Sequence, residues 1–516
     1  MVKRLSALAA IALLACNSSP GNGRENPADS GSHDLVVAVG ADEFGLVLNR
    51  GRLGRYPLNA SICETLVKMT KDFRVVPWLA RRWDYLGNNT YRFTLRRDVR
   101  FHDGHLLSAS DVKYTLDRGI ADKTQYSFLS DSSVRVVDDS TVDIKPSIPN
   151  LRLLDQLVHP SYGIIANGSN PQTHPDCTGP FSFVEYVAKD HLTVSRNDNY
   201  WGAKAKLNRI TFRFMADDNT RALALRAREV DAIFDVNRGS VAELEATPGI
   251  SVVMSPPGAV ILLYVATHGV SPNVRMTDPI VRRAVALAID QSSLVNRVMG
   301  GYAAVVNTVN PPAALGTYFS VVHGISYNPR EANRLLDAAG WKTVKAGMRS
   351  KYGTPLSLSM IVQPNSVDKS ITQYIQAQLA KVGIGVEIED LDGAAYESRL
   401  NSGRFDLDVE IPNQNDANPA FLLALRWYSK SNVRSAPFML AGLRFDSLVS
   451  TSLASADRDS AQRKAAEAMH VLIDDEVAAI PLAGIYRIYA MSNRIRGFDP
   501  HPSRINQAWN TVSMSR

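Results

Sequence analysis

Between Cys63 and Asp117 the sequence reads CETLVKMTKDFRVVPWLARRWDYLGNNTYRFTLRRDVRFHDGHLLSASDVKYTLD. Within this stretch, Tyr91–Leu95 alternates with a period of two, which predicts a half-buried strand. Ser108 and Asp111 form a capping-box pattern ahead of an apolar helical face, so a helix is expected to begin there. A strand, a turn and a helix start in this order indicate an α/β fold.

The same alternation continues on both sides of this stretch. Leu35–Val39 is a short β-branched run followed by glycine, which predicts a buried strand. Asp278-Pro279 and Asn328-Pro329 each combine an N-cap side chain with proline at the first helical position, and so mark two helix starts. We expect Ile280 to lie on the apolar face of the first of these helices. Gly385–Ile388 reads as a strand that follows a helix.

Length and composition restrict the class of protein. A chain of 516 residues with 45% hydrophobic and 21% charged residues is too long for one core, so two or three lobes are expected. The formal net charge of +6 arises from 57 basic and 51 acidic residues whose signs are interleaved along the chain. This pattern indicates a solvated surface and no nucleic-acid partner.

The N-terminus has the pattern of an export signal. Two basic residues precede an apolar run from Leu5 to Ala15, which ends at Cys16. The end of this run resembles a bacterial lipobox, although Leu14 is larger than the residue usual at its position. Residues 1–16 are therefore interpreted as a lipoprotein signal peptide with Cys16 as the lipidated residue; the alternative is an ordinary signal peptide cut elsewhere. Residues 17–33 have the composition of a flexible tether.

Two cysteines, Cys63 and Cys177, remain after the signal. In an exported protein such a pair indicates either a disulfide or two separate buried thiols. The sequence pattern leaves both interpretations open.

Motifs for catalysis are absent from the sequence. It has no G-x-S-x-G, G-x-x-x-x-G-K-[ST], G-x-G-x-x-G, H-E-x-x-H or C-x-x-C motif. His102 and His105 flank an Asp-Gly turn, a spacing more typical of a surface turn than of a metal site. We therefore predict a protein that binds rather than reacts, with no metal site and no cofactor.

Four segments in order resemble the extracytoplasmic solute-binding proteins of ABC transporters, family 5, of the peptide- and nickel-binding type. They are Cys63–Asp117, Cys177–Gly202, Val281–Ala303 and Tyr327–Trp341. The resemblance implies a two-lobed α/β fold of the periplasmic-binding-protein kind, type II, with an extra subdomain in lobe I. It also implies a lobe-forming helix at Cys63.

The resemblance further implies that the chain crosses twice between the lobes. The crossings are expected near Pro256–Ala266 and Ile480–Met491, both of which are apolar and β-rich. Lobe I then comprises residues 34–258 and 483–516, and lobe II comprises residues 259–482.

By the same resemblance, a loop from Pro412 to Asn418 in lobe II holds the ligand. Its polar residues Asn413, Gln414, Asn415 and Asp416 are the predicted contacts, with Asp416 as the partner of a ligand ammonium group. The alternative role for Asp416 is N-cap of the following helix. The loop lacks the tryptophan usual in the family, which favours a polar or zwitterionic ligand.

Lobe I contributes further predicted contacts. Arg55 and Tyr56 fall where relatives touch ligand, and Arg55 has the guanidinium geometry to pair with a carboxylate. His159 falls in a region that faces the cleft in relatives. An ordinary surface or packing role is the alternative for each of the three.

The function implied is that of a lipid-anchored, monomeric receptor outside the cytoplasmic membrane. It would capture a small peptide, a metal chelate or another polar solute by hinge closure and deliver it to an ABC permease. The alternative is a lipoprotein that keeps the binding fold but has lost transport and acts as an envelope regulator or scaffold.

Overall fold

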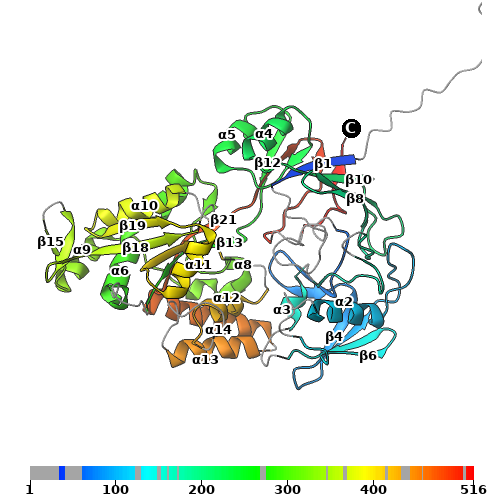
Figure 1. Ribbon diagram of the computed structural model, residues 1–516, viewed down its shortest axis with the longest axis horizontal. Helices are drawn as coiled ribbons and strands as arrows, with labels where there is room; N and C mark the ends of the chain where they lie inside the picture. Colours follow the sequence, from blue (N-terminus) through cyan, green and yellow to red (C-terminus); the bar gives the residue numbers. More distant parts are fainter. Residues whose placement is uncertain are drawn as a thin grey trace, which may run out of the picture. The chain divides into compact units, whose positions relative to one another are not determined.

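The protein is a mixed α/β molecule with two lobes, each built around its own sheet (Figure 1). The structure is a computed structural model. It describes residues 34–40, 61–121, 129–147, 153–159, 162–170, 174–267, 275–344, 347–363, 369–412, 417–429, 431, 442–455, 457–503 and 507–515. None of the helices in these ranges has the length and apolar character needed to cross a lipid bilayer. Cys16 and the rest of the predicted signal and tether lie outside the described residues.

Lobe I contains a seven-stranded sheet. In spatial order its strands are β12 (Ile250–Met254), β22 (Ile488–Ser492), β11 (Ala232–Ile233), β1 (Asp34–Val39), β10 (Arg209–Phe214), β9 (His191–Arg196) and β8 (Phe181–Val187). The central strand β1 is the buried strand that the sequence predicts, and it pairs in parallel with β10 and β11. Leu35, Val37 and Val39 pack on one side of the sheet, whereas Ala38 packs on the other.

A second sheet forms the extra subdomain of lobe I. It consists of β4 (Ala80–Tyr85), β5 (Tyr91–Leu95), β7 (Thr141–Ile144) and β6 (Val134–Asp138), with α2 (Ala109–Ala121) and α3 (Leu153–Leu157) nearby in the same core cluster. The predicted start of α2 is confirmed, because the Asp111 carboxylate accepts hydrogen bonds from both the amide and the hydroxyl of Ser108.

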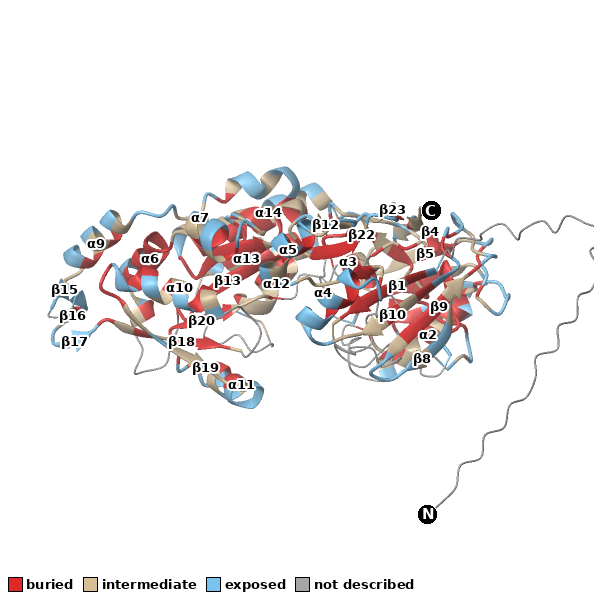
Figure 2. Cartoon of the chain, turned by 90° about the horizontal axis from the view of Figure 1, so that it is seen from above, coloured by how far each residue is buried: buried red, intermediate tan, exposed pale blue. Residues whose placement is uncertain are grey.

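Lobe II is built around a six-stranded sheet. Its order is β14 (Ala303–Ala304), β21 (Ala479–Ile485), β13 (Ala259–Val265), β20 (Leu407–Glu410), β18 (Ser357–Val362) and β19 (Gly385–Asp390). Every residue of β13 is buried, and successive side chains alternate between two cores (Figure 2). Ile261 and Leu263 face the core of α6 (Pro279–Ala288), α9 (Pro329–Ala338) and α10 (Lys369–Ala380). Leu262 and Tyr264 face the core of α12 (Pro419–Arg426), α13 (Leu443–Ala454) and α14 (Arg458–His470).

Local capping chemistry sets the helix starts of lobe II. Asp278 accepts a hydrogen bond from the Ile280 amide at the start of α6, and Asn328 accepts one from Glu331 at the start of α9, as the sequence predicts. The expected apolar role of Ile280 is wrong, because its side chain is 38% exposed. Val281, the next residue in the first turn of α6, is fully buried instead, so the core-facing side of the helix begins one position later.

The chain passes between the two sheets at two places that lie side by side. It leaves β12 at Met254 and enters β13 at Ala259, and it leaves β21 at Ile485 and enters β22 at Ile488. The two crossings are bonded to each other: the Ser255 amide donates to the Arg487 carbonyl, and the Gly258 amide donates to the Ile485 carbonyl. The lobes are therefore joined by a two-stranded connection.

The segment at Cys63 differs from the predicted helix. The chain forms bends from Ser61 and then the strand β2 (Val67–Met69), which pairs with β3 (Val75–Pro77). The carbonyls of Ser61 and Ile62 accept hydrogen bonds from the amides of Phe181 and Gly179, respectively. Because these carbonyls bond to a distant segment, they are not available to a helix that begins here.

Candidate functional site

The predicted ligand loop of lobe II lies between β20 and α12. Asn413, Gln414, Asn415 and Asp416 lie outside the described residues, but both ends of the loop are described. Asn418 is the N-cap of α12, and its side chain accepts a hydrogen bond from the Ala420 amide at 2.9 Å. The alternative role of Asp416 as the cap of this helix is therefore wrong.

A group of buried and partly buried polar side chains connects the two ends of the loop; we call it the loop base. Its members are Tyr264, Tyr396, Asp408, Glu410 and Arg426. Arg426 on α12 forms an ion pair with Glu410 on β20 at 2.5 Å. The Tyr396 hydroxyl donates to the fully buried Asp408 carboxylate at 2.9 Å. The Arg426 guanidinium lies 5.6 Å from the centre of the Tyr264 ring. The strand that enters the loop and the helix that leaves it are thus held together by charge.

Burial dominates the electrostatics of the loop base. It raises the pKa of the Asp408 carboxyl well above its ordinary value, and the neighbouring Glu410 carboxylate raises this pKa further. Burial likewise raises the pKa of the Tyr396 hydroxyl, with a further contribution from Asp408. Two carboxyl groups and one guanidinium therefore share a site between β20 and α12, in which Asp408 is fully buried and Glu410 and Arg426 are partly exposed.

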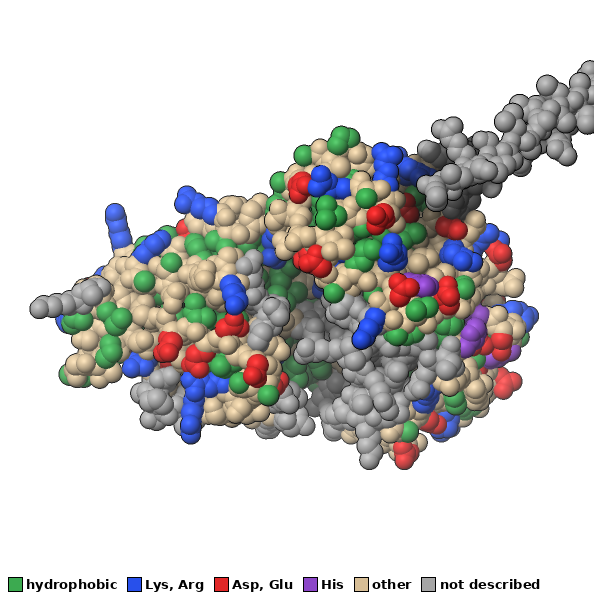
Figure 3. Space-filling view, turned by 45° about the horizontal axis from the view of Figure 1, so that its top comes forward, with side chains coloured by type: hydrophobic (Ala, Val, Ile, Leu, Met, Phe, Trp, Pro, Cys, Tyr) green, Lys and Arg blue, Asp and Glu red, His purple; other side chains and the backbone are tan. Residues whose placement is uncertain are grey.

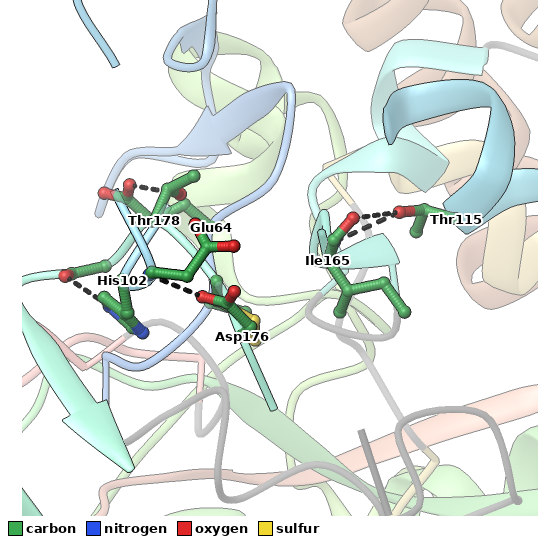
Figure 4. Close-up of a disulfide and its surroundings, with 10 residues drawn as sticks. Glu64, His102, Thr115, Ile165, Asp176 and Thr178 are labelled. Carbon is green, nitrogen blue, oxygen red and sulfur yellow. Dashed lines mark hydrogen bonds between the residues drawn. A yellow bond between two sulfur atoms is a disulfide. The ribbon is translucent and has the colours of Figure 1, made fainter. Parts of the chain in front are cut away.

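In lobe I the predicted contacts Arg55 and Tyr56 lie outside the described residues, which resume at Ser61. A disulfide between Cys63 and Cys177 joins this segment to the one before β8 (Figure 4). Gly179 lies against the same segment so closely that a Cβ atom there would come within 2.2 Å of the Ser61 carbonyl oxygen. The chain that follows Arg55 and Tyr56 is therefore anchored by a covalent bond and by a close backbone contact.

Next to the disulfide is a buried carboxylate, Glu64, whose acceptor sites are all used; we call this group the Glu64 cluster. Trp78 Nε1 and the Tyr200 hydroxyl donate to Oε1 at 2.8 and 2.7 Å. Thr178 Oγ1 and Trp201 Nε1 donate to Oε2, both at 2.9 Å. Figure 4 shows the hydrogen bond between Thr178 and Glu64. Burial raises the pKa of the Glu64 carboxyl, while the four hydrogen bonds oppose the rise.

Glu64 and its four donors lie in two of the segments that carry the family resemblance, Cys63–Asp117 and Cys177–Gly202. Glu64 itself was not among the predicted site residues. A signal was present, since Glu64 is the one acid in a run of otherwise apolar or small residues from Ile62 to Val67. The Asn-Tyr-Trp-Gly segment supplies two of the four donors, Tyr200 and Trp201. A lone acid in an apolar run, with tryptophans elsewhere in the same lobe, is a pattern that can be searched for.

His159 is half-buried just after α3. Its amide donates to the Gln156 carbonyl, and its ring lies 6.4 Å from the Tyr162 ring in an edge-on orientation. Its predicted contact with ligand stays a prediction.

The interpretation of His102 and His105 as a surface feature is correct only in part. His105 is exposed, and its Nδ1 lies 2.6 Å from Asp103 Oδ1. His102 instead turns inward: its Nε2 lies 3.0 Å from the Gly179 carbonyl oxygen, and burial lowers the pKa of its imidazole. Asp103, His105 and Asp176 bring one ligand atom each within 4.8 Å of one another, but the set contains a single imidazole.

Acidic and basic side chains are interspersed on the face of the molecule drawn in Figure 3. This agrees with the interleaved charge of the sequence.

Two lobes, each with a large sheet and cores of its own, and two adjoining crossings are the features of an extracytoplasmic binding protein of the two-lobed class. Comparison with known proteins specifies the family. The sequence profile of the bacterial extracellular solute-binding proteins, family 5 (middle region), matches residues 74–433. The chain belongs to this family, whose members bind solutes for ABC transporters and are not enzymes.

Three relatives illustrate the similarity. The nickel-binding periplasmic protein of Escherichia coli K12 is 25% identical over 446 residues, which cover 82% of this chain and 84% of the relative. A glutathione-binding protein of Pectobacterium atrosepticum is 28% identical over 379 residues, covering 70% of this chain and 69% of the relative. The crystal structure of NikA from Brucella suis in complex with Fe(III)-EDTA has a TM-score of 0.82 at 24% identity, covering 93% of this chain and all of that one. Like its periplasmic relatives, the chain functions outside the cytoplasmic membrane.

Proposed function

We propose that this chain is the lipid-anchored receptor of an ABC importer and that it captures a small polar solute by closing two lobes around it. Lobe I is residues 34–258 and 483–516, and lobe II is residues 259–482. The observation that carries the proposal is the pair of adjoining crossings, because two short connections between rigid cores are the structural requirement for a hinge.

The ligand class follows from the predicted loop and its base. Asn413, Gln414 and Asn415 offer amide donors and acceptors, and Asp416 offers a carboxylate for an ammonium group. The relatives support two solute classes, since one is named for nickel and another for glutathione, which is a tripeptide. We place a zwitterionic peptide of the size of glutathione first and a metal chelate second.

A binding experiment tests this function. The mature chain, without a purification tag, is titrated calorimetrically with glutathione, a tetrapeptide and a nickel–histidine chelate, and solution scattering follows its size. We expect one probe to bind and to reduce the radius of gyration. The receptor function would be contradicted if none of the probes binds and native mass spectrometry finds no co-purified small molecule. That result would favour the scaffold alternative, which is supported by the absence of tryptophan between Phe405 and Phe421.

A pair of variants tests the role of Asp416. Asp416→Asn removes the charge that is proposed to meet the ligand ammonium, so the affinity for glutathione should fall by about tenfold or more. The matched control is an N-acetylated glutathione, which lacks the ammonium and should bind both proteins equally weakly. If Asp416→Asn leaves the affinity for glutathione unchanged, the assignment of this residue is incorrect.

The anchor is tested separately. Mass spectrometry of the membrane-extracted protein should find a diacylglyceryl group on Cys16, and Cys16→Ser should release the chain from the membrane fraction. A mature N-terminus at any other residue would show an ordinary signal peptide instead.

A further inference from the structure

Two histidines and an aspartate meet on lobe II at the end of α14. His470 is the last residue of α14, and Asp474 lies four residues further on in the π-helical turn η8 (Val471–Asp475), so both side chains are on one face. His323 follows the 3-10 helix η6 (Gly316–Val321). One ligand atom from each of the three lies within 4.8 Å of the other two.

The distances centre on the Asp474 carboxylate. Its Oδ2 atom lies 2.6 Å from His470 Nδ1 and 3.9 Å from His323 Nδ1. The two imidazole rings are edge-on to each other, with centres 5.9 Å apart. Both rings thus present a nitrogen to the same oxygen atom.

The carboxylate is oriented by the backbone before any cation arrives. The amides of His323 and Gly324 donate to Asp474 Oδ2 and Oδ1 at 3.1 and 2.7 Å, and the Asp474 side chain is only 12% exposed. Gly324 has φ +70°, and a Cβ atom there would lie 2.9 Å from the Asn307 side chain. A carboxylate has about four acceptor sites, so after two amide bonds it still has a site for a metal ion. Amide donors of this kind act as the outer shell that fixes a metal ligand.

The types of ligand indicate the class of cation. Two imidazoles and one carboxylate suit Zn²⁺ and Ni²⁺, whereas Ca²⁺ and Mg²⁺ prefer oxygen atoms alone. In a zinc site each ligand atom lies about 2.0–2.1 Å from the metal, so the ligand atoms are closer to one another than 4.8 Å. To bind zinc, one of the three side chains therefore has to move toward the other two. His323 has the freedom to do so, since its side chain is 76% exposed. Asp475 lies at the other nitrogen of the His470 ring, with its Oδ1 atom 3.7 Å from Nε2, and its Oδ2 atom pairs with Arg444 Nη1 at 3.4 Å, so it is not a ligand in this arrangement. What distinguishes His470 from His191 is the second imidazole, His323, at the Asp474 carboxylate.

Another histidine shows what this arrangement requires. His191 also has two acidic neighbours, with Asp190 at 2.9 Å from Nδ1 and Glu185 at 3.3 Å from Nε2. These carboxylates lie at opposite nitrogens of the ring, so a single cation does not reach both together with the imidazole. His191 is therefore a matched control: a histidine with acidic neighbours but without convergent ligand atoms.

We propose that His323, His470 and Asp474 bind one divalent cation of the zinc and nickel class, separately from the solute that the receptor carries. The cation would join the segment after η6 to the end of α14. Its consequence is a stabilisation of lobe II that depends on the metal concentration.

The experiment uses the full mature chain without a histidine tag, freed of metal by a chelator. Zinc chloride and nickel chloride are titrated calorimetrically into the parent and into His323→Ala, His470→Ala and His191→Ala, and the melting temperature is recorded with and without metal. We expect one equivalent to bind the parent and His191→Ala and to raise their melting temperatures. Each of the other two variants should lose affinity by more than about tenfold, since even outer-shell changes cost ~10–100-fold.

Copper(II) bound to the parent gives an independent count of ligands. The electron paramagnetic resonance spectrum of the copper-bound parent should show coupling to two imidazole nitrogens. The spectrum of copper-bound His323→Ala should show coupling to one. The proposal is overturned if both variants keep the parent's affinity or if His191→Ala loses as much affinity as they do. Unchanged melting temperatures of the metal-free variants verify that they fold. Because the probes are the bare metals, a negative result in this experiment does not contradict the proposed solute-binding function. Likewise, a negative result in the solute titrations does not contradict the proposed metal site.

Discussion

The two lobes bury a carboxylate in different ways beside the segments proposed to meet the solute. In lobe I, Glu64 receives four hydrogen bonds from neutral donors, two on each oxygen. In lobe II, Asp408 and Glu410 lie close to one guanidinium, that of Arg426. The Glu64 charge is oriented by neutral donors and interacts through space with Lys68, whereas Arg426 pairs directly with Glu410 and also interacts with Asp408. Loss of Arg426 should therefore cost more than loss of the charge on Glu64.

A covalent bond adds to the contrast. Lobe I contains the Cys63–Cys177 disulfide, and no cysteine occurs in the sequence between Cys177 and the C-terminus. Lobe II, as delimited above, therefore has no disulfide.

Removal of the disulfide is the largest expected effect. The bond spans 114 residues, and closure of a loop of this length stabilises a fold by about 5 kcal/mol in the chain-entropy estimate. Cys63→Ala with Cys177→Ala should lower the free energy of unfolding by that amount in urea titrations. Hydrogen exchange should quicken in β8 and β9 more than in β13. Equal loss of protection in both lobes would show that the bond stabilises the whole chain and not lobe I.

Arg426→Met tests the charged side of the contrast. The substitution leaves the buried Asp408 and the partly buried Glu410 without their cation, so the free energy of unfolding at pH 7 should fall by about 4 kcal/mol. Urea titration measures it, and lower pH should restore part of the loss as the Asp408 carboxyl, whose pKa is raised by burial, takes up a proton.

The matched control is Arg444→Met, because Arg444 is exposed and pairs with Asp475 at 3.4 Å. It should change the free energy of unfolding by less than about 1 kcal/mol. If the two substitutions lower the free energy of unfolding equally, the loop base does not contribute more to stability than an exposed ion pair.

Asp406→Asn examines a buried carboxylate of lobe II whose main hydrogen bond comes from the Ser359 amide at 2.9 Å. Burial raises the pKa of Asp406 from its ordinary 3.8 to about 6. The folded state thus keeps a proton that the unfolded state releases between these values, and stability falls as pH rises through about 6. At pH 7 the asparagine variant should be more stable than the parent by about 3 kcal/mol, at 1.36 kcal/mol per pKa unit.

Urea titrations at pH 4 and pH 7 measure this difference. The gain should be nearly absent at pH 4, where the carboxyl is protonated in the folded state. Asp390→Asn, at an exposed position, serves as the control and should show no such dependence. A gain of the same size at both pH values would mean that it does not arise from ionisation.

Glu64→Gln is expected to give the smallest effect. Glutamine keeps one acceptor oxygen but turns an amide NH₂ toward two donors, which should cost about 2 kcal/mol. The fluorescence of Trp78 and Trp201 should shift in the same variant because both rings contact this side chain. A loss larger than that of Arg426→Met would reverse the comparison between the lobes.

The features that the sequence predicted correctly are those decided locally. The starts of α2, α6 and α9 follow from side chains within three residues of the caps, and β13 follows from an uninterrupted apolar run. The expected helix at Cys63 failed because the carbonyls of Ser61 and Ile62 bond to amides more than a hundred residues away. Such contacts are set by the tertiary fold, and a local pattern does not contain them.

The predicted ligand contacts rest on resemblance alone and stay predictions. No local pattern joins Glu64 to Tyr200 and Trp201, or His323 to His470, since each group assembles from segments far apart in the sequence. The loop from 413 to 416 was found through its place between β20 and α12, and its residue roles stay predictions.

The bonded crossings limit how this molecule can open. The Ser255–Arg487 and Gly258–Ile485 bonds tie one connecting strand to the other, and a Cβ atom at position 258 would come within 1.8 Å of the Pro502 carbonyl oxygen. Sliding one half along the other would break this ladder and push backbone into backbone. Torsion about the paired strands would keep both hydrogen bonds, so the hinge closure proposed above is expected to be a rotation about this connection.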